Sequence, residues 1–350
     1  MRGAVFTLLL AFSAAAYAQD LRAPLPIRDQ FLLNNGFFFF EPERAAVLDD
    51  EQWRLTLNTS DSNTFAKSAW ITHNLARGIG RADAGQELSD SRFRGEDPLF
   101  LADGETHRFE LAVRRGFGAH LELGLTLPIT RIGGGWSDVL VEDVHRALGV
   151  GNAGRETLRQ NSETVFIETA STMYLRDRSA GYSIGDIALN AKYELAPRAE
   201  GSVHMALAGA IELPAGNAQT LAGSGSFDAG VEMIVSRDFA KSALHVSTGV
   251  VHLGGDRVIG SDALIVVSGT IAGSRMISDR SSVVVQLTIS QSPLRHLGPA
   301  ELTHRSNQLS VGMQHQIGRT AILYVALIEN VLNYENSADA GLAWGITRRF

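Results

Sequence analysis

The chain of 350 residues contains no cysteine, so neither a disulfide bond nor a thiolate metal site can stabilise it. After its first 18 residues it also lacks any apolar run that approaches the length of a transmembrane helix. Basic residues are in the minority, with 31 Lys and Arg against 38 Asp and Glu. The resulting net charge of −7 argues against a nucleic-acid partner, because phosphate recognition requires a basic surface.

The first 18 residues have the layout of a secretory signal peptide. Arg2 precedes the apolar stretch 4–16, and Ala16-Tyr17-Ala18 is a small-x-small site that a signal peptidase could cut. The stretch is too short to remain as a membrane anchor. We therefore predict that residues 1–18 are a cleaved signal peptide and exclude them from the fold.

The rest of the chain is dominated by an apolar–polar alternation with a period of two. In residues 119–129 the odd positions are apolar, whereas the even positions carry His120, Glu122, Gly124 and Thr126. The same pattern, in stretches separated by Gly, Ser, Asp, Asn or Pro, occurs at 51–59, 65–75, 105–115, 186–195, 201–213, 225–236, 242–253, 261–272, 282–290, 306–317, 319–330 and 337–350. About ten residues let a tilted strand cross the hydrocarbon layer of a membrane.

This pattern predicts an all-β fold, a transmembrane antiparallel up-and-down β-barrel of about 12–14 strands over residues 51–350. A barrel is required because lipid offers no partner to the unpaired backbone groups of an open sheet. Residues 19–50 are predicted to form an N-terminal segment in the periplasm or in the lumen. The alternative is a secreted soluble β-protein, although the strands of a β-sandwich are mostly shorter.

The last stretch of the sequence is itself an alternating strand that ends on an aromatic residue. Trp344, Ile346 and Phe350 share its apolar face. This stretch resembles the C-terminal recognition strand of bacterial outer-membrane barrels. The resemblance implies that these three residues form an assembly signal for the barrel-assembly machinery. The protein would then reside in the outer membrane of a Gram-negative bacterium, in contact with lipid and lipopolysaccharide.

Counting strands backwards from Phe350 leaves the number of strands in one region undecided. If Phe350 faces the periplasm, the short turn 317–319 faces it as well, and the longer stretch 291–305 lies outside. The region 130–182 must then cross the wall an even number of times. The strand-like run 162–175 is one crossing, so either a second strand is present in this region or that run lies outside the wall.

The region 130–182 also contains the only convincing helix pattern. Asp138 can cap a helix over 138–148 that Gly149 ends. Its apolar face comprises Leu140, Val144, Ala147 and Leu148, opposite a polar face of Glu142, His145 and Arg146. The helix, which also carries Asp143, is expected either to plug the lumen or to lie in a loop at the barrel mouth.

Several short motifs are distributed along the chain. They are Asp103-Gly104-Glu105, the Gly-rich stretch that leads to Asp143 and His145, Gly185-Asp186-Ile187, Leu213-Pro214-Ala215-Gly216 and Gly223-Ser224-Gly225. On these motifs the chain resembles an uncharacterised family of proteobacterial outer-membrane barrels, the domain of unknown function 3187. Its second half is also similar to putative transporters of aromatic compounds. The resemblance implies an architecture and names no substrate, so it supports transport only by analogy.

Charged residues on the polar faces are the candidates for contact with a solute. They are Arg108, Glu110, Arg114, Glu122, Lys192 and Glu194, whose mixed charges suggest no strong ion preference. We therefore predict a passive channel or transporter for small solutes, with the loops 77–104, 130–161 and 291–305 folded over its mouth. The alternative is a structural barrel in which these residues form cross-strand pairs that fill a narrow interior.

One constellation suggests catalysis instead. His304-Arg305-Ser306-Asn307 has the His-x-Ser-Asn form of outer-membrane lipid esterases, and a fold about Gly318 would place Glu329 or Asn330 opposite Ser306. However, the alternation of the strand points Ser306 into the lumen, away from acyl chains. A lipid esterase that uses His304, Ser306 and Asn330 is therefore the alternative function. No cofactor and no metal site are predicted.

Overall fold

A computed structural model describes residues 21–69, 71, 98–149, 151–152, 154–169, 173–176, 181–195, 203–256, 258–331 and 335–350. The predicted signal peptide and most of the loop 77–104 lie outside these residues. Among the described helices, none combines the length and the apolar character that a membrane crossing requires.

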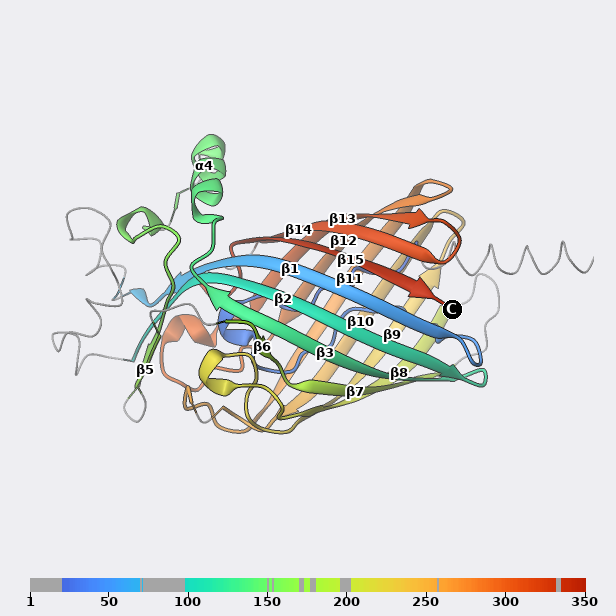
Figure 1. Ribbon diagram of the computed structural model, residues 1–350, viewed down its shortest axis with the longest axis horizontal. Coiled ribbons are helices and arrows are strands. Elements are labelled where there is room, and N and C mark those ends of the chain that lie inside the picture. The colour runs from blue at the N-terminus through green and yellow to red at the C-terminus, as the bar shows by residue number, and fades with distance from the viewer. Residues whose placement is uncertain are drawn as a thin grey trace, which may run out of the picture.

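Twelve antiparallel strands form a closed barrel, as the alternation predicts (Figure 1). The strands are β1 (Trp53–Lys67), β2 (Leu99–Phe117), β3 (Leu121–Gly133), β7 (Ile187–Glu194), β8 (Val203–Leu213), β9 (Asp228–Asp238), β10 (Ser242–Leu253), β11 (Leu264–Ser278), β12 (Ser281–Ser290), β13 (Ser306–Ile317), β14 (Ala321–Asn330) and β15 (Ala340–Arg349). The first and last strands close the ring, with Arg54 opposite Arg349 and Asn63 opposite Ala340. Every neighbouring pair in the ring is hydrogen-bonded, so no strand has a free edge.

The two ends of the barrel differ in the length of their connections. At one end the strands are joined by the short turns 118–120, 239–241, 279–280 and 318–320, and the C-terminus lies at the same end. We call this the short-turn end and the opposite one the long-loop end. In bacterial outer-membrane barrels the short turns face the periplasm, which gives the barrel its orientation.

Strand β10 illustrates why these sequences form a membrane barrel. Leu244, Val246 and Val250 point outward and are 41–45 % exposed, whereas His245 and Ser247 point inward and are buried. Successive side chains of a strand lie on opposite faces, so one alternating sequence supplies both an apolar exterior and a polar interior.

One expectation about strands is corrected, and one open alternative is resolved. The stretches 51–59 and 65–75 are not separate strands, because β1 runs unbroken through residues 53–67. The run 162–175 lies outside the wall: β4 (Thr164–Glu168) pairs with the end of β2 that extends beyond β3, and β5 (Met173–Arg176) pairs with β4. Among the described residues between the end of β3 and residue 182, none forms a strand of the barrel wall. The short strand β6 (Ser183–Ile184) pairs with β3 just before β7.

The helix α4 (Asp138–Leu148) stands at the long-loop end, outside the lumen (Figure 1). Gly149 ends it in the left-handed conformation, with φ 71°. The predicted apolar face is not the buried one, since Leu140 is 53 % exposed while Val141 and Glu142 are buried. The cause is the anchoring of Asp138, whose Oδ1 accepts hydrogen bonds from Asn63 Nδ2 (2.8 Å) and Arg155 Nη1 (2.6 Å). The remaining helical turns are η1 (Leu32–Asn34), η3 (Arg155–Thr157), η4 (Ala218–Thr220) and η5 (Ala300–Thr303).

Candidate functional site

Residues 21–50, here called the lumen segment, run through the interior of the barrel. The first limb ascends from the short-turn end along β12 and β13. Ser282 Oγ donates to Leu21 O at the start of β12, Leu25 N donates to Gln286 Oε1 (3.1 Å), and Gln30 N donates to Gln308 Oε1 near the long-loop end (2.9 Å). Wall glutamines thus supply the acceptors that the irregular backbone of this limb needs.

The second limb returns to the short-turn end along other strands. Phe38 N donates to Asp228 Oδ2 at the long-loop end (3.3 Å), Ala45 N to Ser236 Oγ (2.9 Å), and Leu48 N to Glu122 Oε2 near the opposite end (3.0 Å). The lumen segment therefore begins and ends at the short-turn end, and it continues directly into β1.

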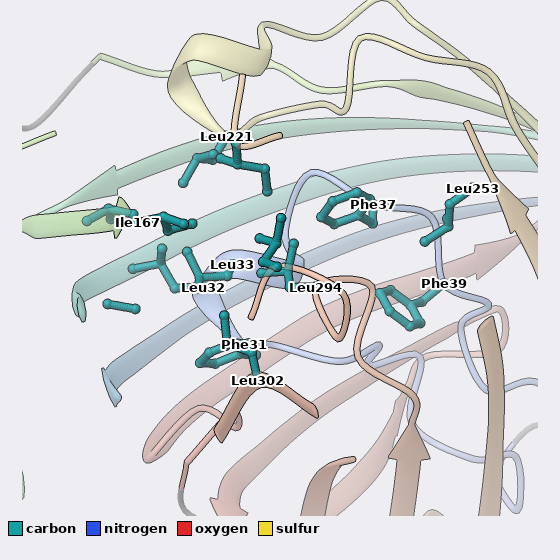
Figure 2. Packing of buried hydrophobic residues seen from close by; sticks show 14 of the residues in the cluster. Phe31, Leu32, Leu33, Phe37, Phe39, Ile167, Leu221, Leu253, Leu294 and Leu302 are labelled. Carbon is teal, nitrogen blue, oxygen red and sulfur yellow. The ribbon is translucent and has the colours of Figure 1, made fainter. Parts of the chain in front are cut away.

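The turn of the lumen segment is buried in an apolar cluster at the long-loop end, which we call the mouth cluster. Figure 2 shows Phe31, Leu32, Leu33 and Phe37 packed beside residues from the long connections, namely Ile167, Leu221, Leu294 and Leu302. Burial of a leucine or phenylalanine side chain contributes about 1.5–3 kcal/mol. Residues of the long connections thus pack onto the lumen segment at the mouth of the barrel.

Below the mouth cluster, ion pairs also join the descending limb of the lumen segment to the wall. Lys192 Nζ lies 2.7 Å from Glu43 Oε2, and Arg114 Nη1 lies 3.4 Å from the same oxygen. Glu122 accepts from Arg54 Nη2 (2.7 Å) and lies 3.6 Å from Lys192 Nζ. Glu43 of the lumen segment therefore completes a buried network of wall charges.

The other predicted lumen residues are also buried on the inner face. Arg108 pairs with Glu110 (3.0 Å) and donates to Asn35 Oδ1 of the lumen segment (3.2 Å). Glu194 lies 3.2 Å from His204 Nδ1. The six predicted residues thus form pairs within the wall and also contacts with the lumen segment. Sequence reasoning missed Glu43, since it lies outside any strand pattern.

A cavity remains between the descending limb and strands β2, β3, β7 and β8. Its lining combines the aromatic side chains of Phe38, Phe39 and Phe40 with small residues of β7 and β8 and with charged residues, which are Arg28, Glu41, Glu43, Arg108, Glu110, Arg114, Asp186 and Glu212. The lining of this cavity thus combines apolar and polar surface. The run Gly36-Phe37-Phe38-Phe39-Phe40 is the sequence signal that could have indicated this aromatic surface.

Three of the family motifs converge at one point of the long-loop end. The carboxylate of Asp186 accepts from Gly216 N (2.6 Å) and from Ser224 N (2.8 Å), which ties the loop between β8 and β9 to the start of β7. Burial raises the pKa of Asp186 above its ordinary value. A Cβ atom on Gly223 would lie 2.5 Å from Asp186 Oδ1, so only glycine fits there without displacing the carboxylate.

The constellation predicted for catalysis is not assembled. The turn 318–320 sets the register so that Asn330 lies opposite Gln308, two residues away from Ser306. Ser306 is buried, whereas the exposed ring of His304 binds Glu335 through Nδ1. Asn330 Nδ2 donates instead to Asp339 Oδ1 (3.3 Å). The expectation that Glu329 or Asn330 would lie opposite Ser306 is therefore wrong.

The remaining predicted residues lie on the outer surface. Trp344, Ile346 and Phe350 are all exposed on the lipid-facing side of the barrel, and Phe350 N donates to Trp53 O (3.0 Å). In α4, Asp143 pairs with Arg146, and His145 Nδ1 lies 3.1 Å from Asn152 Oδ1. The two helix residues therefore do not plug the lumen.

The family model described as a protein of unknown function, DUF3187, matches residues 82–350. The chain belongs to the DUF3187 family. The matched part of this DUF3187 protein includes β2 and every later strand of the barrel, whereas the lumen segment and β1 precede it. None of the curated proteins matches the sequence.

Among solved structures, this DUF3187 protein is similar to the COG4313 outer membrane channel from Pseudomonas putida F1. The two chains are 11% identical over 89% of this chain and 100% of the other, with a TM-score of 0.55. The Ralstonia pickettii toluene transporter TbuX is 10% identical over 88% of this chain and 92% of that one, with a TM-score of 0.38, which is too low to support an inference. The first likeness shows that the fold is that of bacterial outer-membrane barrels.

Proposed function

We propose that this protein is an outer-membrane channel or transporter for small solutes in which movement of the lumen segment opens the path. The observation that carries the proposal is that residues 21–50 form a loop inside the lumen, and that both ends of this loop lie at the short-turn end of the barrel. A barrel with a purely structural role would need only side chains to fill its interior.

The contacts between the lumen segment and the wall are of a kind that permits the segment to leave the lumen. Along the two limbs, hydrogen bonds and ion pairs to inward polar side chains join the segment to the wall. Water can replace polar partners of this kind, so their net contribution is only about 0.5–1.5 kcal/mol for each neutral hydrogen bond. The likeness to an outer membrane channel agrees with this function by analogy of fold.

Conductance of a tethered variant tests the proposal. Ser62 Oγ donates to Gln30 O (3.2 Å), so Gln30→Cys with Ser62→Cys would join the lumen segment to β1 close to its turn. The chain has no other cysteine that could interfere. The matched control is Thr270→Cys with Thr288→Cys, a pair of facing wall residues on β11 and β12.

We expect the oxidised Gln30–Ser62 variant to lose conductance in planar bilayers and uptake of small solutes into liposomes, and reduction with dithiothreitol to restore both. The wall control should conduct equally in both redox states. Equal conductance of the tethered and reduced forms would show that the segment does not move. Absence of flux in every variant would favour a structural barrel.

The cellular context is part of the same proposal. We propose that residues 1–18 direct export and are removed, and that the barrel is then inserted among outer-membrane phospholipid and lipopolysaccharide by the assembly machinery. The exposed aromatic end of β15, at Phe350, supports recognition by that machinery. Fractionation of a Gram-negative host, with mass spectrometry of the mature N-terminus, tests both steps.

A further inference from the structure

Three side chains with metal-binding chemistry meet on the outer face of the barrel, away from the lumen. Asp61 on β1 lies directly opposite His107 on β2, and Glu105 is two residues from His107 on the same face. Phe109, the next residue of that face toward the short-turn end, is an exposed apolar residue. The cluster therefore lies beside the apolar band, toward the long-loop end.

The ring of His107 lies between the two carboxylates, so a shared ion would bind to only one of its two nitrogens. His107 Nδ1 lies 3.2 Å from Asp61 Oδ2, and His107 Nε2 lies 4.0 Å from Glu105 Oε2. One ligand atom from each of the three residues lies within 4.8 Å of the others. Ligand atoms around a tetrahedral zinc ion, at about 2.1 Å from the metal, are roughly 3.4 Å apart.

One carboxylate oxygen of Glu105 is fixed by hydrogen bonds, whereas the other accepts none from the described residues. Its Oε1 accepts from both the backbone N and the Oγ of Ser137, the residue that precedes α4. Its Oε2 has no hydrogen-bond partner among the described residues, although the side chain is only 1 % exposed. A buried carboxylate oxygen without a partner is costly, and this one is aimed at the ring of His107.

Gly135 preserves the space around that oxygen, because a Cβ atom there would lie 1.5 Å from Glu105 Oε2. Gly134 lets the same stretch pass close to the backbone at residue 161, since a Cβ atom on it would lie 2.1 Å from Asn161 O. The Asp103-Gly104-Glu105 motif and the Gly-rich stretch before α4, which the proposed channel function leaves unexplained, thus meet at this cluster.

We propose that Asp61, Glu105 and His107 form a binding site for a divalent transition-metal ion. Two carboxylates and one imidazole are a ligand set for Zn²⁺ or Mn²⁺, whereas Ca²⁺ and Mg²⁺ prefer oxygen ligands alone. The ion satisfies the open oxygen of Glu105 and ties β1 and β2 to the connection that carries α4. The site does not depend on whether the barrel conducts.

Metal binding by the untagged full chain in detergent tests the site. After removal of metal with a chelator, the protein is titrated with ZnCl₂ and, separately, with MnCl₂, MgCl₂ and CaCl₂ by isothermal calorimetry. We expect one saturable zinc site per chain, weaker manganese binding, and an affinity for zinc at least about tenfold lower in Glu105→Gln and His107→Asn. Absence of saturable zinc or manganese binding would overturn the proposal.

Two matched controls separate this site from other histidines and from folding defects. His315→Asn removes an exposed histidine at the short-turn end and should leave zinc binding unchanged. Gly135→Ala keeps all three ligands but displaces the carboxylate of Glu105, so it should weaken binding, while Gly151→Ala, where a Cβ meets open space, should not. Heat-modifiable migration on gels verifies that each variant is folded. Equal zinc binding by folded His107→Asn and His315→Asn would refute the assignment.

Discussion

Lys192 Nζ on strand β7 lies 2.7 Å from Glu43 Oε2 in the second limb of the lumen segment. The two residues are 149 positions apart in the sequence, and the lysine side chain is only 1 % exposed. A wall charge and a charge of the lumen segment therefore depend on each other inside the barrel, and substitution of this pair is the most direct way to weaken the contact between the segment and the wall.

Lys192→Met should favour the open state. Removal of one partner leaves Glu43 and Glu122 with one cation fewer in a buried site, and the loss of a partner from a buried ion pair costs about 3–5 kcal/mol. Since the cost falls on the state in which the lumen segment is docked, we expect more frequent channel opening in single-channel recordings. Lys241→Met, at an exposed turn lysine, is the control. Identical opening of the two variants would mean that the ion pair does not hold the segment.

Gly249→Val should loosen the descending limb. A Cβ atom on Gly249 would lie 2.9 Å from Cδ2 of Phe40, so a larger side chain must push the Phe40 ring away, at a cost of about 1–3 kcal/mol. We expect faster hydrogen exchange at amides 41–48, measured by mass spectrometry. Gly273→Val, on the outer face where nothing lies within 4 Å, should leave that exchange unchanged. Slow exchange in both variants would show that Phe40 adapts without releasing the limb.

Deletion of Phe350 should slow assembly of the barrel. Phe350 exchanges backbone hydrogen bonds with Trp53 (3.0 and 3.4 Å) at the seam between β1 and β15, and its side chain is 61 % exposed. The measurement is the fraction of heat-modifiable, folded protein in the outer membrane after pulse labelling. Phe117→Ala, which also removes an exposed aromatic side chain at the short-turn end, serves as the control. Normal assembly of the deletion variant would contradict an assembly role for this residue.

The loop between β10 and β11 should become more stable as the pH falls from 7 to 5. Asp256 Oδ1 accepts from Val258 N (2.7 Å) and Ile259 N (3.2 Å), and burial raises the pKa of this carboxyl to about 6. Because the folded loop binds a proton more tightly than the unfolded loop, protonation between roughly pH 4 and pH 6 favours the folded form.

Hydrogen exchange at amides 258–261, corrected for its intrinsic pH dependence, measures this stabilisation. Asp256→Asn cannot ionise and should remove the pH dependence while keeping an oxygen acceptor. A variant that retains the same pH dependence would assign the effect to another group.

The sequence was sufficient to predict the wall of the barrel because the signal is local. Each strand places alternate residues in lipid and in the interior, so 242–253 could be recognised as a strand without knowledge of its neighbours. The inward position of residues such as Glu122 and Lys192 follows from the same alternation.

Features that depend on distant partners could not be predicted. The lumen segment has no periodic pattern, and its place is set by wall side chains that are distant in the sequence, such as Gln286 for Leu25 and Gln308 for Arg28. The register of β13 and β14 was misjudged because the chain turns through Gly318, Arg319 and Thr320 rather than about Gly318 alone. The open oxygen of Glu105 depends on Ser137, which the alternation does not place.

The two ends of the lumen segment lie at the same end of the barrel, and this arrangement has a kinetic consequence. A segment that entered at one end and left at the other would be threaded, but residues 21–50 can withdraw without breaking any strand pair. Because Trp53 begins β1, a withdrawn segment stays covalently attached beside the entrance. Re-entry is then unimolecular, with an effective concentration of about millimolar for a short flexible tether. Re-closure therefore does not depend on how many copies of the protein the membrane holds.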